Sequence, residues 1–412
     1  MGYSPLFFKI ILVFTLIYSG DALCGVNSKV LENGLRVIYS DTGSTYPGVV
    51  MSVFVRGGAG LSFHKKSAFT SMAQDYASVR IKRLSRNYGF RYRTNISWDY
   101  VSYVFYLSPG SMKYSVPKIM SVFFNPEPIN LEELNYLKNG VEQKSLWEMN
   151  RKAMLYPMVS FFTSRQSVYS AGFNGFLEDA LSISDIEFNQ FASCYFSTNN
   201  VVMSFAGVKE KNVPFDDAKI YKPCFKDESF EEQPFVVSST PNSDFSYYNA
   251  VGTGFVARVG FLSSPCREKS VVYDLITELA KEDDRINSIA NSFYTQNNCY
   301  SKMGTIEFIF SGASTNFYAG TFIKELSGLT KRLDQASLDK AKENILSSYY
   351  SKMYSKEDKS YLLAKAEVTS GNYKELLDYP AILEKIDVTD IKKELKTLVG
   401  STYASVFMKM GK

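Results

Sequence analysis

Histidine is almost absent from this chain, whose 412 residues include only one, His64. A zinc site built from three histidines, or from two histidines and a carboxylate, therefore cannot form within the chain. A Ser-His-Asp or Cys-His arrangement could form only once, around His64. That residue lies in a polar stretch, where we expect an exposed loop. The scarcity of histidine excludes several common catalytic sites.

A strong excess of charge of one sign is also missing. The chain has 46 Lys+Arg against 42 Asp+Glu, which gives a formal net charge of +4. Dedicated nucleic-acid binders carry a strongly basic face, so this balance argues against that class. Apolar residues make up 45% of the chain, enough for sizeable cores, and the length predicts two to three domains.

Long hydrophobic runs are missing except near the N-terminus. The run Ile10–Tyr18 follows a lysine and is much shorter than the roughly 20 residues of a membrane span. Small residues follow it, including Gly20 and Ala22 at the two positions that matter for signal cleavage. Residues 1–24 are therefore predicted to be a secretory signal peptide, cleaved after Ala22 or after Cys24. An uncleaved anchor is the alternative.

Cysteine is scarce and scattered. The five cysteines are Cys24, Cys194, Cys224, Cys266 and Cys299. No Cys-x-x-Cys pair is present, so a cysteine zinc site has no support. One or two disulfides are possible in an oxidising compartment, but the sequence does not determine the pairing. Isolated buried thiols are the preferred interpretation.

A stretch rich in charge and proline divides the chain into two parts of similar length. It covers residues 209–244 and is predicted to be a linker with little secondary structure. It separates an N-terminal lobe at 25–208 from a C-terminal lobe at 245–412.

The two lobes end alike. Ile183-Ser-Asp-Ile186 is followed by Val201-Val-Met203, and Val388-Thr-Asp-Ile391 is followed by Val406-Phe-Met408. Both matches have the same offset along the chain. In each copy a capped helix leads to a short apolar strand. Two matches in register indicate an internal duplication.

Periodicity predicts the same order of elements in both lobes. Strands are expected at 35–39, 48–55, 94–107, 252–261 and 304–311. Helices are expected at 66–79, 114–124, 130–152, from 183 onward, and at 271–281, 317–333 and 338–352. The sequence therefore predicts an α+β fold with two homologous lobes, each a mainly antiparallel sheet with helices packed on one face.

Four segments resemble the pitrilysin/insulinase-type zinc peptidases, the inverted zincins. Leu31–Val37 and Val53–Gly60 are similar to the first two strands of the family. Ser182–Val208 resembles the close of its first lobe, and Gln335–Ile345 resembles a helix of its second lobe. The family includes mitochondrial processing peptidase and the core subunits of the respiratory cytochrome bc complex. The order and spacing of the segments carry the resemblance over nearly the whole mature chain.

The resemblance implies a catalytic motif, His-x-x-Glu-His, on the helix after the second strand. Its two histidines share a helix face and bind zinc, and the glutamate activates the metal-bound water. Aligning Lys66–Phe69 with the approach to the motif places Ser71, Gln74 and Asp75 at the three positions. An amide cannot accept a proton from water near neutral pH, and a serine with an aspartate makes a poor zinc site. We therefore expect no catalytic residue and no bound metal in this chain.

The resemblance also implies residues outside the motif. Active members take a third zinc ligand from a later helix, where Glu142 and Glu148 are candidates here. They use an arginine and a tyrosine of the second lobe to bind the substrate backbone. Tyr300 is the candidate substrate-binding tyrosine, whereas Phe293 stands at the arginine position.

One basic stretch has several interpretations. Six basic residues and no acid lie between positions 80 and 93: Arg80, Lys82, Arg83, Arg86, Arg91 and Arg93. A solvated helix face running into a strand is preferred. A basic lining that attracts acidic peptides or a partner, and a nucleic-acid site, are the alternatives. Asn95-Ile-Ser97 would also be a glycosylation site in a eukaryotic secretory pathway.

These features together predict a secreted protein, placed best in a periplasm, that is a non-catalytic homologue of a zinc peptidase. It would act as the inactive subunit of a heterodimeric metalloendopeptidase and would shape a chamber for peptide substrates. Zinc is then expected only in a partner subunit that carries the motif. No nucleic-acid partner and no transmembrane segment after signal removal are expected. The alternative is a binding or assembly protein, a scaffold with no peptidase partner.

Overall fold

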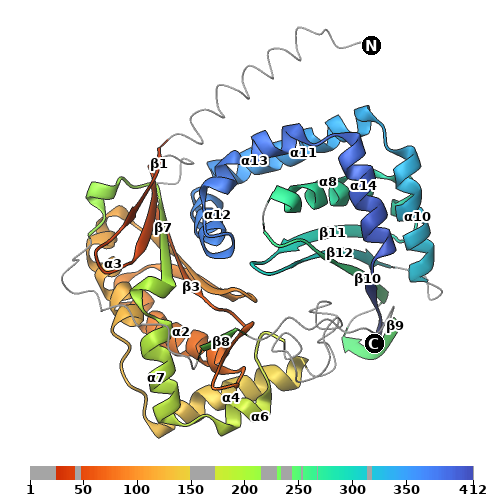
Figure 1. Ribbon diagram of the computed structural model, residues 1–412. Coiled ribbons are helices and arrows are strands. Elements are labelled where there is room, and N and C mark those ends of the chain that lie inside the picture. The colour runs from red at the N-terminus through yellow and green to blue at the C-terminus, as the bar shows by residue number, and fades with distance from the viewer. Residues whose placement is uncertain are drawn as a thin grey trace.

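The protein folds into two lobes, each built around its own sheet (Figure 1). The computed structural model describes residues 25–41, 48–148, 172–214, 230–232, 244–251, 254–266, 268–312 and 318–411. The predicted signal peptide and much of the predicted linker lie outside these residues. The architecture is α+β, as the sequence predicts.

The first lobe contains a six-stranded sheet in the order β1-β2-β7-β3-β6-β5. Its strands are β1 (Val26–Val30), β2 (Arg36–Ser40), β3 (Val49–Arg56), β5 (Arg91–Ile96), β6 (Tyr100–Leu107) and β7 (Val201–Ala206). β2 and β7 are parallel and the other pairs are antiparallel. Among the described strands β5 pairs only with β6, so its outer edge is open.

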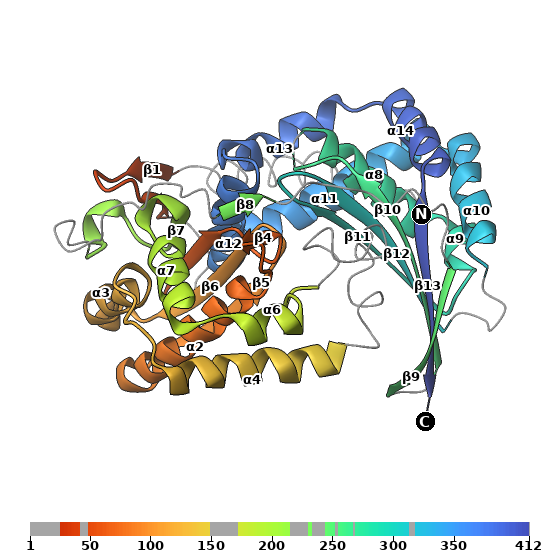
Figure 2. The ribbon, with the colours of Figure 1, turned by 60° about the horizontal axis from the view of Figure 1, so that its bottom comes forward.

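Helices of the first lobe cover one face of this sheet. They are α2 (Phe69–Tyr88), α3 (Pro109–Phe124) and α7 (Asp185–Tyr195). Their apolar residues form one core with the side chains of β3 that point to the same face, such as Met51 and Val53. α4 (Leu131–Glu148) packs on the outer side of α2, and the short helix α6 (Leu177–Ser182) packs on α4 (Figure 2).

The second lobe repeats this arrangement. Its sheet has the order β11-β12-β10-β13-β9, and only β13 and β9 are parallel. The strands are β9 (Asp244–Val251), β10 (Gly254–Ser263), β11 (Ser292–Cys299), β12 (Gly304–Ser311) and β13 (Tyr403–Gly411). The helices α8 (Glu268–Glu282), α10 (Ala319–Arg332) and α14 (Val388–Gly400), with the short α9 (Asp284–Asn287), contribute to its core.

Five strands of the first sheet correspond in order to the five strands of the second, and β1 is additional. β3 lies between β6 and β7, as β10 lies between β12 and β13, and β5 and β11 form the matching edges. The last helix of each lobe begins with a capping box, Ser184 with Glu187 and Asp387 with Asp390. The common topology supports the internal duplication predicted from the matching ends of the lobes.

A helix of the second half covers the other face of the first sheet. α12 (Lys356–Thr369) follows α11 (Gln335–Tyr354) and precedes α13 (Lys374–Lys385). Leu363 and Ala364 of α12 join a buried cluster with Ile38, Phe54 and Tyr100 of the first sheet. Both faces of β3 are therefore buried, which explains why apolar residues occupy both faces of the strand, with Ser52 the one polar residue before the terminal Arg56.

Polar contacts fix α12 in place. The carboxylate of Glu367, with only 3% of its side chain exposed, pairs with the Nε of Arg36 at 2.8 Å and lies 3.9 Å from Arg56. Ser360 Oγ donates to Ser52 Oγ at 2.8 Å inside the cluster. The two lobes are thus joined by a mixed apolar and ionic interface.

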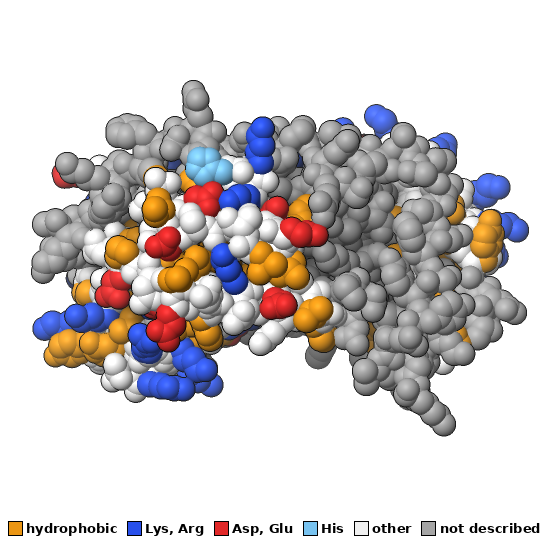
Figure 3. All heavy atoms as spheres, turned by 90° about the horizontal axis from the view of Figure 1, so that it is seen from below, with side chains coloured by type: hydrophobic (Ala, Val, Ile, Leu, Met, Phe, Trp, Pro, Cys, Tyr) orange, Lys and Arg blue, Asp and Glu red, His pale blue; other side chains and the backbone are white. Residues whose placement is uncertain are grey.

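The described part of the predicted linker contributes secondary structure to the first lobe. β8 (Phe230–Glu232) pairs with β4 (Leu61–Phe63), and a short 3-10 helix spans Glu210–Asn212. Beyond β4 the chain turns at His64 and Lys65, both with positive φ. His64 is exposed, as expected, and is visible in pale blue in Figure 3. No helix among the described residues combines the length and hydrophobicity needed to cross a membrane.

Three of the cysteines correct a prediction. Cys266 and Cys299 form a disulfide that joins the segment before α8 to the end of β11. Cys194 is also disulfide-bonded. The prediction of isolated buried thiols is therefore wrong for these three residues. Cys266 and Cys299 lie 33 positions apart in sequence and meet only in the fold, so the sequence pattern did not reveal their pairing.

Candidate functional site

The three motif positions lie in the first two turns of α2. The apolar residues Phe69, Met72 and Tyr76 turn one side of this helix into the core. Ser71 is fully buried and Gln74 is nearly so, with 8% exposed. The helical spacing therefore brings the three side chains to one region of the lobe, as the resemblance implies.

Ser71 and Gln74 are already engaged by neighbouring segments. Ser71 Oγ donates to Oδ1 of the buried Asn174 at 3.3 Å, and Gln74 Nε2 donates to Oγ1 of Thr94 at 3.0 Å. The segment that carries Asn174 lies against the start of α2 because Gly175, at φ +76, has no Cβ. A Cβ there would lie 2.7 Å from the backbone of Ala68.

Asp75 forms an ion pair with a lysine of α4. Lys144 Nζ lies 2.8 Å from both carboxylate oxygens of Asp75. The two side chains are 38% and 24% exposed, so the pair is partly screened from water. Gly140, one turn earlier on α4, lets that helix approach, since a Cβ there would be 3.2 Å from Oδ2 of Asp75. A fixed cation therefore accompanies the only carboxylate of the motif positions.

These residues do not fit a zinc ion. Ser71 uses its hydroxyl to donate, Gln74 presents a neutral amide, and the carboxylate of Asp75 already has a cation at hydrogen-bond distance. Zinc in proteins prefers thiolate, imidazole and carboxylate ligands. Among the described residues, no group of three or more His, Cys, Asp or Glu side chains could hold a metal. No step of a metal-assisted mechanism can be assigned to this donor set.

A cavity of about 480 Å³ lies beside the motif positions, of which Gln74 lines it. It is lined by Gln74, Asn95, Ile96, Gln143, Lys144, Trp147, Phe173 and Asn174. A second cavity, of about 450 Å³, lies between β5 and β6 on one side and α11 and α12 on the other. Asn95 of the open edge strand β5 lines both. The edge of the first sheet therefore runs along two cavities, one of which is bounded by both lobes.

Tyr300, the candidate substrate-binding tyrosine, is brought close to this region from the second lobe. Its ring packs against a small buried cluster that contains Trp98 and Met303. Ile96 and Phe173, which line the first cavity, pack against the same cluster. Burial, aided by the nearby carboxylates of Glu307 and Asp99, raises the pKa of Tyr300 well above its ordinary value. Its hydroxyl is therefore a hydrogen-bonding group rather than a base near neutral pH.

Phe293, at the position where the resemblance implies an arginine, belongs to the core of the second lobe. Its ring stacks on that of Phe308 and packs against that of Phe310. This position offers no charge to a ligand.

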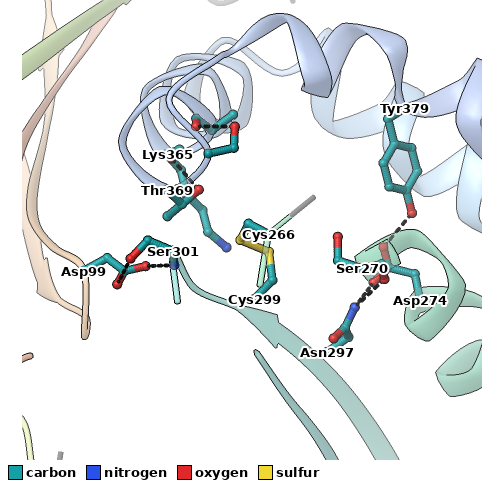
Figure 4. Close-up of a disulfide and its surroundings, with 12 residues drawn as sticks. Asp99, Cys266, Ser270, Asp274, Asn297, Cys299, Ser301, Lys365, Thr369 and Tyr379 are labelled. Carbon is teal, nitrogen blue, oxygen red and sulfur yellow. Dashed lines mark hydrogen bonds between the residues drawn. A yellow bond between two sulfur atoms is a disulfide. The ribbon is translucent and has the colours of Figure 1, made fainter. Parts of the chain in front are cut away.

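A second polar group lies where the turns of the two lobes meet (Figure 4). Asp99 accepts hydrogen bonds from the N–H and the Oγ of Ser301, at 2.6 and 2.8 Å. The Cys266–Cys299 disulfide lies at the end of β11, the strand that leads to Ser301. The side chain of Lys365 extends from α12 toward this group of residues (Figure 4). Burial raises the pKa of Asp99 and lowers that of Lys365. This cluster fixes the lobes relative to one another beside the cavities.

The two candidate zinc-ligand glutamates belong to α4. Glu142 is exposed on α4, and Glu148 ends that helix, with its side chain outside what the structure describes. Sequence reasoning missed Lys144, which lies between these two glutamates on the same predicted helix. Its position there was the only available signal.

The basic stretch is divided between structural and exposed roles. Arg80 lies over the ring of Tyr76 at 3.8 Å and pairs with Glu133 at 3.4 Å. Arg93 pairs with Glu357 of α12 at 2.9 Å and so contributes to the contact between the lobes. The remaining basic residues of α2, Lys82, Arg83 and Arg86, are exposed. The face seen in Figure 3 has basic side chains gathered at its lower left, with basic, acidic and hydrophobic ones mixed over the rest of its described part. This arrangement favours the solvated helix face.

Sequence comparison finds no relative. No model of a known protein family matches the chain, and no curated protein matches it by sequence.

Comparison of structures gives clear similarities. A protease from Helicobacter pylori is 16% identical with a TM-score of 0.78, and the match covers 93% of this chain and 99% of the protease. A chain of complex III2 from Candida albicans is 12% identical with a TM-score of 0.77, covering 94% and 96%. A protein from Alicyclobacillus acidocaldarius, named for its likeness to M16 peptidases, is 11% identical with a TM-score of 0.77, covering 93% and 98%.

These similarities show the fold. The chain has the two-lobed α+β architecture of M16-like peptidases over nearly its whole length, as the resemblance to pitrilysin-type enzymes implies. At such low identity the residues of the site, rather than the fold, must carry any functional conclusion.

Proposed function

We propose that this protein is a secreted, non-catalytic homologue of a zinc peptidase, acting as the inactive subunit of a heterodimeric peptidase. The observation that carries the proposal is the ion pair between Asp75 and Lys144, 2.8 Å apart, at the position where the fold would carry its metal-binding motif. A peptidase fold without zinc ligands retains a peptide-sized space but has no means of activating water.

The open edge of β5 supports a role in holding peptides. An extended peptide can add to an exposed strand edge through main-chain hydrogen bonds. Thr94 and Asn95 are exposed on this strand, and both line the cavity between the lobes. The inactive subunit would thus supply one wall of a chamber for peptide substrates, while zinc is held by a partner subunit that carries the motif.

Secretion is supported by the N-terminal segment and by the cysteines. Residues 1–24 have the pattern of a cleaved signal, and the Cys266–Cys299 disulfide is typical of proteins in oxidising compartments. A periplasm fits both observations. Mass spectrometry of the protein exported from a bacterial host would give the mature N-terminus, expected after Ala22 or Cys24.

The test of the function is reconstitution. The full chain is purified alone and assayed for cleavage of a mixture of unstructured peptides, with and without a chelator. A homologue that carries His-x-x-Glu-His and is encoded beside this chain is then added. We expect no cleavage by the lone protein, a stable complex of the two chains, and chelator-sensitive cleavage by the complex. Chelator-sensitive cleavage by the lone chain would contradict the proposal.

A second function is favoured by one observation. A chain of complex III2 from Candida albicans superposes on this protein with a TM-score of 0.77, so the same fold occurs in an assembly. We propose as the alternative a binding or assembly scaffold without a peptidase partner. Co-purification of a complex that lacks any motif-bearing homologue would favour it.

A further inference from the structure

Two amide side chains in the wall of the cavity beside the motif positions each have a polar atom with no hydrogen-bond partner among the described residues. Gln74 donates through Nε2 to Thr94, and its Oε1 has no donor among the described residues. Asn174 accepts through Oδ1 from Ser71, and in the described part of the chain its Nδ2 has no acceptor. The cavity wall therefore offers both donors and acceptors to a ligand.

Lys144 adds a charged donor to this wall. An ammonium group has three N–H donors. The ammonium of Lys144 donates to both carboxylate oxygens of Asp75, each at 2.8 Å, which accounts for two of them. No other acceptor for Nζ is present among the described residues, and the side chain lines the cavity. One N–H is thus available to a group in the cavity.

The chemistry of the cavity favours an uncharged ligand. The charges of Asp75 and Lys144 cancel, and the other lining side chains are amides or apolar groups. The ring of Trp147 is 59% exposed at the rim, and Phe173 and Ile96 add apolar surface. A peptide main chain has the required mixture of N–H and C=O groups, and an apolar side chain would pack on the aromatic rings.

We propose that Lys144 is a substrate-binding residue whose ammonium donates to a main-chain carbonyl of a neutral peptide segment held in this cavity. The inference rests on the proposed function, because it names the ligand class of the same chamber. Asn95 and Ile96 of β5 line the cavity, so an extended segment along the edge strand passes Lys144. A cation fixed by Asp75 holds the carbonyl but supplies no activated water, so binding occurs without hydrolysis.

The test measures binding of a peptide of about eight residues with blocked termini, no charged side chain and one central phenylalanine. The full chain is compared with the double variant Asp75→Asn/Lys144→Met, which removes both charges together and leaves no unpaired carboxylate. Lys82→Met, on the exposed face of α2, is the matched control. We expect affinity to fall about tenfold in the double variant, as for a lost hydrogen bond to a charged group, and to stay unchanged in the control.

A second measurement needs no variant. Lysines of the wild-type chain are acetylated with and without the peptide, and the sites are quantified by mass spectrometry. The peptide should slow acetylation of Lys144 and leave that of Lys82 unchanged. Wild-type binding with equal affinity in the double variant, or without protection of Lys144, would overturn the inference while leaving the proposed function intact. Failure of the wild-type chain to bind any neutral peptide, or binding of a neutral oligosaccharide in its place, would overturn both.

Discussion

Asp99 of the first lobe holds Ser301 of the second through two hydrogen bonds, one from the main-chain N–H and one from the hydroxyl. The aspartate lies in the turn between β5 and β6, directly beside the open edge of the first sheet. The serine follows the disulfide at Cys299. The contact therefore ties the strand that borders the cavities to a braced turn of the other lobe, and it leads to a prediction about pH.

Asp99 should make stability depend on pH. Burial raises the pKa of this carboxyl above its ordinary value of 3.8, so the folded state holds the proton more tightly than the unfolded chain. The contribution of Asp99 is therefore most favourable below pH 3.8 and declines as the pH rises through the folded-state pKa. Urea unfolding followed by the fluorescence of the neighbouring Trp98 measures this.

The comparison for this prediction is Asp99→Asn, which keeps the shape and cannot ionise. The free energy of unfolding of the wild type, relative to that of the variant, should fall as the pH rises above about 3.8. A constant difference, or one that grows in favour of the wild type, would show that Asp99 is not perturbed in this way.

Among the charged residues at the contact between the lobes, we expect substitution of Glu367 to lower the free energy of unfolding most. It pairs with Arg36 and also accepts from the N–H of Tyr373 at 3.1 Å, and its side chain is only 3% exposed. Glu367→Ala would leave the buried N–H of Tyr373 and the partly exposed guanidinium of Arg36 without their acceptor, and should cost about 2 kcal/mol. Glu210→Ala is the control, because Glu210 pairs with Lys29 while both are about half exposed, 51% and 53%. The control should change stability by roughly 0.5 kcal/mol or less, and similar losses in both variants would contradict the account.

The Cys266–Cys299 disulfide should stabilise the second lobe. The two cysteines are 33 positions apart, so the cross-link restricts a moderately long loop of the unfolded chain. Replacing both by serine should lower the free energy of unfolding by about 3–4 kcal/mol. Peptide mapping under non-reducing conditions should recover the linked pair. Free thiols at both positions in the purified protein would rule the disulfide out.

Substitution of Phe54 tests whether the stability of α12 depends on its packing against the first sheet. Its fully buried ring packs against those of Tyr100 and Tyr361, the latter on α12. Phe54→Ala should cost about 3–5 kcal/mol through the cavity that it leaves. Hydrogen exchange should show α12 losing protection together with the first sheet. Unchanged protection of α12 would indicate that this helix is held by the second lobe alone.

Local patterns in the sequence predicted much of the fold, because apolar periodicity and repeats are local signals. The expected strand at 48–55 and helix at 271–281 correspond closely to β3 and α8. The expected strand at 94–107 is instead two strands, β5 and β6. The turn between them contains neither glycine nor proline, the residues that usually mark a turn in sequence.

Contacts between residues far apart in the sequence could not be predicted from such local patterns. The sequence indicated that the motif positions lack zinc ligands, but the pairing of Asp75 with Lys144 depends on how α4 packs on α2. The burial of Phe54 against α12 and the pairing of Cys266 with Cys299 likewise join segments far apart in the chain. A single sequence carries no record of these contacts, which only the folded structure reveals.

The central claim is that the motif positions carry an ion pair, Asp75 with Lys144, beside a binding cavity instead of a zinc centre. The most direct measurement is the zinc content of the purified full chain after dialysis against excess zinc and removal of free metal, with Asp75→Asn in parallel. The account predicts far less than one zinc ion per chain in both proteins. One zinc ion per wild-type chain, lost in the variant, would contradict it.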